Sequence, residues 1–93
     1  MRRAARVDAN HVAVVDALRA VGCRVVSLAA AGKGLADLLV LNPRRRLILL
    51  EVKDGSKPPS KRRLTPDQVK FHGVWPVVVV TSPADAVAQA LAA

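Results

Sequence analysis

Glu51 and Lys53 stand out because they are charged residues in an otherwise apolar segment. Glu51, the only glutamate of the chain, follows four large aliphatic residues at 47–50 and precedes Lys53 by two positions. Side chains two apart in a strand share one face, so Glu51 and Lys53 point the same way. A carboxylate in such a strand loses hydration and needs a partner. The pair predicts either an ion pair at a strand end or a chemical site.

A second carboxylate reaches the same face if the preceding segment forms a hairpin with this strand. With a three-residue loop at 43–45, Asp37 lies directly opposite Glu51. Directly opposed side chains have Cβ atoms about 5 Å apart. A two-residue loop would instead turn Asp37 to the other face. We adopt the three-residue loop, because a single glutamate in an apolar strand of a strongly basic chain favours a site.

Two opposed carboxylates favour a divalent cation, since alone they repel each other and lose hydration. Mg²⁺ takes a few oxygen ligands and keeps several waters. The carboxylates of Asp37 and Glu51 and the backbone carbonyl of Val52 could supply those ligands. The structural alternative is an ion pair between Glu51 and Lys53, with Asp37 capping a turn.

The surrounding elements follow from periodicity and from turn residues. These signals predict strands over 23–29, 36–42, 46–53 and 77–82, and helices over 9–21, from Thr65 onward, and from Ser82 to the C-terminus. The two middle strands carry apolar residues on both faces, so we expect the sheet to be covered on both sides. The chain thus reads as one α/β domain over residues 1–93, with a mixed sheet flanked by helices.

The charge balance points to a polyanionic partner, because 15 Lys and Arg against seven acids give a net charge of +8. Basic residues gather in the segment 1–6, which we expect to be flexible, at 44–46, and in the loop after the Glu-x-Lys strand. We predict DNA-backbone contacts in that loop by Lys57, Lys61, Arg62 and Arg63. Lys33 either reaches a phosphate or is a solvated loop lysine. Nothing resembles a helix that reads bases, and aromatic residues are nearly absent, which argues against single-strand binding by stacking.

Other features limit where the protein acts. A single cysteine, Cys23, gives no disulfide framework. No apolar run approaches the ~20 residues of a membrane span. The first residues, MRRAARVD, lack the apolar stretch of a signal peptide. We therefore expect a cytoplasmic protein with no membrane partner.

The run GKGLADLLVLNPRRRLILLEVKDG resembles the PD-(D/E)XK nuclease motif, in which an Asp on one strand is followed by Glu-x-Lys on the next. Together with a first helix ending in Gly and a downstream Leu-Thr-Pro-x-Gln, residues 6–82 resemble the VRR-NUC family of that superfamily, in its small phage and bacterial form. The resemblance implies a restriction-endonuclease-like α-β-β-β-α-β core with a C-terminal helix. It also implies a homodimeric, metal-dependent endonuclease related to Holliday-junction resolvases, cutting branched or flapped DNA, as in DNA repair.

The resemblance also assigns roles. Asp37, Glu51 and the Val52 carbonyl would hold Mg²⁺ or Mn²⁺, which activates a water. Lys53 would position that water or stabilise charge on the phosphate. Gln68 stands where the family places a site residue, although a capping box with Thr65 also accounts for it.

Two positions depart from the family pattern. Ala36 replaces a proline at the strand entry, and His11 stands near the place of a Glu or Gln on the first helix. His11 either ligates the metal, with a preference for Mn²⁺, or bonds a backbone carbonyl. We expect His72 and Trp75 to finish their helix rather than to do chemistry.

Two other functions fit the same sequence. The chain could be a nucleic-acid-binding module of this fold whose catalytic site has decayed, with His11 as the lost ligand. It could also be a subunit that depends on a helicase or recombinase to find its substrate. A requirement for metal distinguishes the nuclease from the binding module.

Overall fold

The structure is a computed structural model that describes residues 9–32 and 34–93, so the segment 1–6 and Lys33 lie outside it. The elements follow the predicted order: α1 (Ala9–Ala20), β1 (Arg24–Ser27), β2 (Leu38–Leu41), β3 (Leu47–Val52), α2 (Pro66–Val74), β4 (Val77–Val80) and α3 (Pro83–Ala92). Short 3-10 turns lie at Ala29–Ala31 and Pro59–Lys61. No helix in the described part of the chain is long and apolar enough to cross a membrane.

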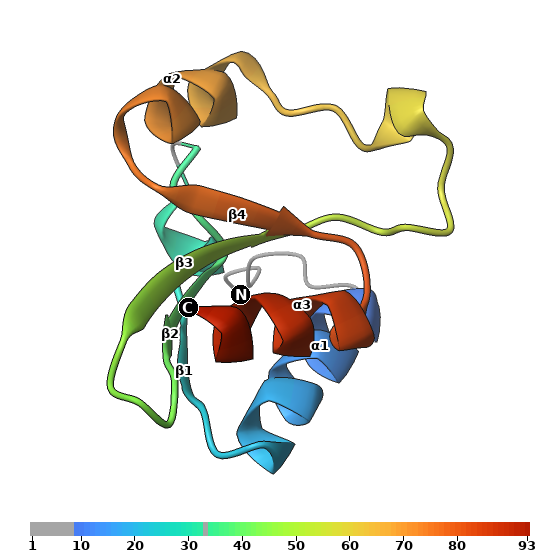
Figure 1. Ribbon diagram of the computed structural model, residues 1–93. Helices are drawn as coiled ribbons and strands as arrows, with labels where there is room; N and C mark the ends of the chain where they lie inside the picture. Colours follow the sequence, from blue (N-terminus) through green and yellow to red (C-terminus); the bar gives the residue numbers. More distant parts are fainter. Residues whose placement is uncertain (1–8, 33) are drawn as a thin grey trace, which may run out of the picture.

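The four strands form one mixed sheet in the order β1-β2-β3-β4 (Figure 1). The first two pairs are antiparallel, and β3 pairs with β4 in parallel. Leu39 lies opposite Leu49, and the backbone N–H of Asn42 donates to the carbonyl of Arg46 at 2.9 Å. This is the register of the three-residue hairpin loop, so that prediction is confirmed.

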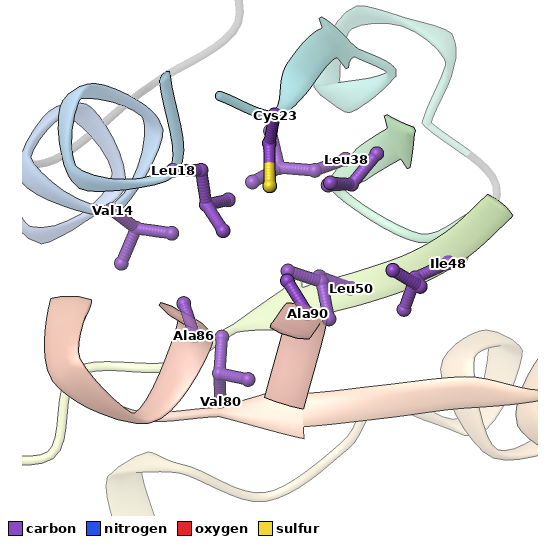
Figure 2. Close-up of a cluster of buried hydrophobic side chains, with 10 residues drawn as sticks. Val14, Leu18, Cys23, Leu38, Ile48, Leu50, Val80, Ala86 and Ala90 are labelled. Atoms are coloured by element: carbon purple, nitrogen blue, oxygen red, sulfur yellow. The ribbon is translucent and has the colours of Figure 1, made fainter. Parts of the chain in front are cut away.

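The core lies between one face of the sheet and the helices α1 and α3, which pack against each other (Figure 1). Helical spacing puts Val14 and Leu18 on one stripe of α1, and strand alternation puts Leu38 and Leu50 on the covered face. Figure 2 shows these side chains meeting above α3, whose small residues Ala86 and Ala90 allow a close approach. The buried cluster comprises Val14, Leu18, Cys23, Leu38, Val40, Ile48, Leu50, Val80, Ala86 and Ala90.

The opposite face, which we call the open face, is covered much less. Three of its aliphatic side chains remain exposed: Leu47 at 71%, Val26 at 56% and Val79 at 40%. Within the described residues, α2 approaches this face only near the end of β3, where Glu51 and Lys53 lie. Helices therefore lie on both sides of the sheet, as expected, but in the described part of the chain α2 covers only the Glu51 end of the open face.

The β2–β3 hairpin is fixed to the end of α3 by polar contacts. The side chain of Asn42, only 3% exposed, donates to the carbonyl of Ala90 at 2.9 Å. Its Oδ1 accepts the backbone N–H groups of Arg44 and Arg46, each at 2.9 Å. The Arg44 guanidinium donates to carbonyls at the end of α3, including that of Ala93 at 3.0 Å. These contacts satisfy carbonyls that a helix end leaves without a partner.

Candidate active site

Asp37 and Glu51 lie together on the open face, as the hairpin register requires. Glu51 is only 2% exposed, although glutamate is an ionisable residue that is rarely buried. Asp37 directly precedes β2, and its Oδ2 accepts the backbone N–H of Val52 at 2.8 Å. That bond ties the Asp37 carboxylate to the strand that carries Glu51. The two acids therefore form a positioned pair.

Burial is the main cause that raises the pKa of Glu51 from its ordinary value near 4.5 to about 8. The hydrogen bond to Asp37 and the negative charge of Asp37 raise this pKa further, while the positive charge of Lys53 lowers it. A buried acid with this pKa carries a proton near neutral pH unless a cation takes the proton's place. This is the electrostatic environment that a divalent ion stabilises.

Gln68 connects α2 to Glu51 of β3 and to Lys53, which directly follows this strand. Its Nε2 donates to Oε2 of Glu51 at 2.9 Å, and its Oε1 accepts from Nζ of Lys53 at 3.1 Å. The same Oε1 accepts the backbone N–H of Thr65 at 2.9 Å, completing the capping box. Gln68 is thus a helix cap and a site neighbour at once. Lys53 Nζ lies 3.9 Å from Oε2 of Glu51.

His72 also faces this site, which the sequence interpretation missed. Its Nε2 lies 3.8 Å from Oε1 of Glu51, and both atoms are buried with no hydrogen-bond partner. Burial and the charge of Lys53 lower the pKa of His72, against the opposing effect of Asp37. The helical spacing of Gln68 and His72, four residues apart on one face, was the available signal.

Polar contacts and one glycine hold α2 in place, since none of its residues is buried. Gly34 lies against the start of this helix with φ +76°, and a Cβ there would come within 2.4 Å of the backbone carbon of Asp67. Only glycine allows both this backbone conformation and this approach. The loop before Asp37 therefore helps to place Gln68 and His72.

A comparison with solved structures supports what this geometry indicates. The chain is similar to a structure described as a VRR-NUC domain, with 30% sequence identity and a TM-score of 0.59, over 80% of this chain and 82% of that one. The chain belongs to the VRR-NUC family. The predicted family and the predicted restriction-endonuclease-like α/β fold are thereby confirmed. No family model and no curated protein matches the sequence.

The first helix of this VRR-NUC domain carries His11, which is buried on the stripe with Val14 and Leu18. That stripe faces the covered side of the sheet, whereas Glu51 projects from the open face. A ligand role for His11 stays a prediction. Next to it, the side chain of Asn10 donates to the carbonyl of Lys53 at 3.0 Å and so anchors the start of α1 to the end of β3.

Four of the five predicted DNA-contacting residues occupy the segment between β3 and α2, which runs out from the end of β3 and returns to α2 (Figure 1), while Lys33 lies outside the described residues. Lys57, Lys61 and Arg63 are exposed. Arg62 is half-buried, and its Nε donates to the carbonyl of Lys57 at 2.8 Å. The loop thus contains an internal hydrogen bond, between Arg62 and Lys57, and three cations that are exposed to solvent.

The donor groups of the VRR-NUC site fit a divalent cation. The described residues contain no preformed cluster of three or more His, Cys, Asp or Glu side chains. They do contain the two carboxylates of Asp37 and Glu51, with one buried carboxylate oxygen, Oε1 of Glu51, without a hydrogen-bond partner. Carboxylate and carbonyl oxygens are the ligands that Mg²⁺ and Mn²⁺ take.

Proposed function

We propose that the chain is a divalent-metal-dependent endonuclease that cleaves DNA according to its structure, acting on branched or flapped forms. The observation that carries this proposal is the buried carboxyl group of Glu51, with the half-buried Asp37 and Lys53 beside it on one face of the sheet. A buried acid beside a second carboxylate is costly to the fold without a cation, and such electrostatics cluster at functional sites. Membership in the VRR-NUC family supports the same reaction.

Asp37, Glu51 and the carbonyl of Val52 would hold Mg²⁺ or Mn²⁺. The bound ion would lower the pKa of a water and offset charge on the scissile phosphate. Gln68 keeps Oε2 of Glu51 engaged and orients the Lys53 ammonium. Lys53 then presents a fixed positive charge to the phosphate, which stabilises charge better than reorienting solvent does.

DNA is the substrate that the charge of the protein favours. The net charge is +8, and the exposed cations of the loop follow directly after the strand that carries Glu51 and Lys53. Phosphate contacts of this kind supply affinity without base specificity. Selection by DNA shape is therefore a better match to these residues than selection by sequence.

A second copy of the chain is the partner that we propose for the open face. Leu47 is exposed there at the start of β3, away from Glu51, and Val26 is exposed on the edge strand β1. Phosphate-rich DNA gains little from aliphatic surface, whereas a two-fold dimer buries the same patch on both subunits. Such a dimer would bring two sites to one branched substrate. Light scattering should give a dimer mass for the wild type and a monomer mass for Leu47→Lys, and a monomeric wild type would contradict the arrangement.

Cleavage assays test the reaction itself. Linear, flapped and four-way DNA would be incubated with the protein in Mg²⁺, Mn²⁺ or EDTA, beside Glu51→Gln and the exposed control Asp16→Asn. Metal-dependent cutting of branched forms that is lost only in Glu51→Gln supports the nuclease. Salt-sensitive DNA binding without cutting in either metal would replace it by the binding module with a decayed site.

A further inference from the structure

Two buried atoms at the site lack the partner that every comparable atom has. Among the described residues, Oε1 of Glu51 and Nε2 of His72 are the buried side-chain nitrogen and oxygen atoms without a hydrogen bond. They lie 3.8 Å from each other. Buried polar groups are nearly always paired, because an unpaired one costs its lost hydration. Two such atoms facing each other indicate a ligand that contacts both.

Two neighbouring carboxylate oxygens already accept hydrogen bonds, which limits the kinds of ligand that the two unpaired atoms could bind. Oε2 of Glu51 accepts from Gln68, and Oδ2 of Asp37 accepts from the backbone of Val52. The side chains of Glu51 and His72 are 3% and 12% exposed, so bulk water does not satisfy the pair. Once Glu51 has lost its proton, its carboxylate oxygen and the imidazole nitrogen both offer lone pairs, and a cation binds both.

The distance between the atoms suits a single metal ion. Metal–oxygen and metal–nitrogen bonds of about 2.1 Å place two ligand atoms between about 3 Å apart, at neighbouring positions, and about 4.2 Å apart, at opposite ones. The observed separation of 3.8 Å lies inside this range. The described residues hold no preformed cluster of three such ligands, so Glu51 and His72 would have to move to share an ion with Asp37.

We propose that Nε2 of His72 is a ligand of the divalent ion held by Asp37 and Glu51, an inference that rests on the proposed function. A nitrogen ligand changes the character of a site otherwise built from oxygen. Imidazole suits transition ions, whereas Mg²⁺ prefers oxygen and retains its waters. His72 therefore shifts the site away from Mg²⁺ and toward Mn²⁺ and later transition ions.

Mn²⁺ bound to the full chain provides the test, because pulsed EPR detects a nitrogen atom bonded directly to Mn²⁺. The chain has two histidines, so His72→Asn is compared with His11→Asn. Calorimetry gives the affinities of both proteins for Mn²⁺ and Mg²⁺. Since α2 contributes no buried residue, His72→Asn should keep the fold, and circular dichroism checks this.

The expected result is a nitrogen coupling in the wild type and in His11→Asn that disappears in His72→Asn. The Mn²⁺ affinity of His72→Asn should fall by about tenfold or more, while its Mg²⁺ affinity should change by less than about threefold. A coupling that persists in His72→Asn, or one that is absent from Mn²⁺-loaded wild type, overturns the His72 assignment and leaves the nuclease standing. A wild-type protein that binds no divalent ion and cuts no DNA would contradict both the His72 assignment and the proposed nuclease function.

Discussion

The burial of Glu51 makes the stability of the fold depend on pH. The Nζ atom of Lys53 lies 3.9 Å from Oε2 of Glu51, and Nε2 of His72 lies 3.8 Å from its Oε1. In the unfolded chain the acid titrates near 4.5, and in the folded chain near 8. The folded state therefore holds a proton that the unfolded state releases between these values.

In EDTA, the free energy of unfolding should fall as the pH rises from about 5 to about 8, because this stabilisation is complete below the unfolded pKa and is lost through the folded one. Glu51→Gln removes the titrating group, so its unfolding should depend less on pH over that range. Denaturant titrations across the range measure both. Identical slopes in the two proteins would show that Glu51 does not hold the proton.

Gln68 performs two tasks that substitution can separate. Thr65→Ala removes the hydroxyl that accepts the N–H of Gln68, and the loss of such a cap costs about 1 kcal/mol. It leaves the bonds from Gln68 to Glu51 and Lys53 in place. Gln68→Ala removes those two bonds and the oxygen that accepts the N–H of Thr65. Cleavage should therefore fall by about 10- to 100-fold, against little change in Thr65→Ala. Steady-state cleavage rates and thermal melts of both variants separate the two tasks. Equal losses of activity would mean that Gln68 acts only as a helix cap.

The position of α2 rests on the glycine loop before β2. Gly34→Ala should push α2 from the sheet, because the new Cβ would approach the backbone of Asp67 to 2.4 Å. Gly32→Ala is the matched control, since Gly32 has φ +65° but no atom within 4 Å of its Cβ position. Both variants bear a backbone cost of about 1 kcal/mol or more, but Gly34→Ala alone should lose cleavage.

Hydrogen exchange would locate the change. The amides of α2 should exchange faster in Gly34→Ala while those of β2 and β3 keep their protection. Equal exchange in the two glycine variants would mean that Gly34 does not position the helix.

Local sequence rules predicted the elements that local physics determines. The period of two and the length of the loop at 43–45 set the hairpin register, so the meeting of Asp37 with Glu51 could be predicted. The capping box of Thr65 and Gln68 likewise predicted the start of α2. The role of His72 could not be derived in this way, because its distance to Glu51 depends on where the segment 53–65 returns the chain. The contact of Arg44 with the end of α3 is equally non-local.

At the scale of the whole molecule, two clusters of positive charge lie at the two ends of β3. The hairpin at 43–45 lies at one end, and the loop that carries Lys61 and Arg63 follows the other (Figure 1). Glu51 and Lys53 lie near the second end. If net charge alone drew DNA, both ends would contribute alike. If DNA lies across the site, the loop contributes more.

Salt dependence distinguishes these two cases. Each phosphate contact contributes about 0.9 to the slope of log affinity against log salt on duplex DNA. Replacing Lys61 and Arg63 by Gln should lower the magnitude of that slope by about 1.8. The same change at Arg45 and Arg46, also exposed, removes equal charge and should lower it by much less. Fluorescence anisotropy with Glu51→Gln protein measures binding without cleavage. Equal effects of the two pairs would mean that DNA does not follow the loop, and a flat slope in the parent protein would rule out the phosphate backbone as its ligand.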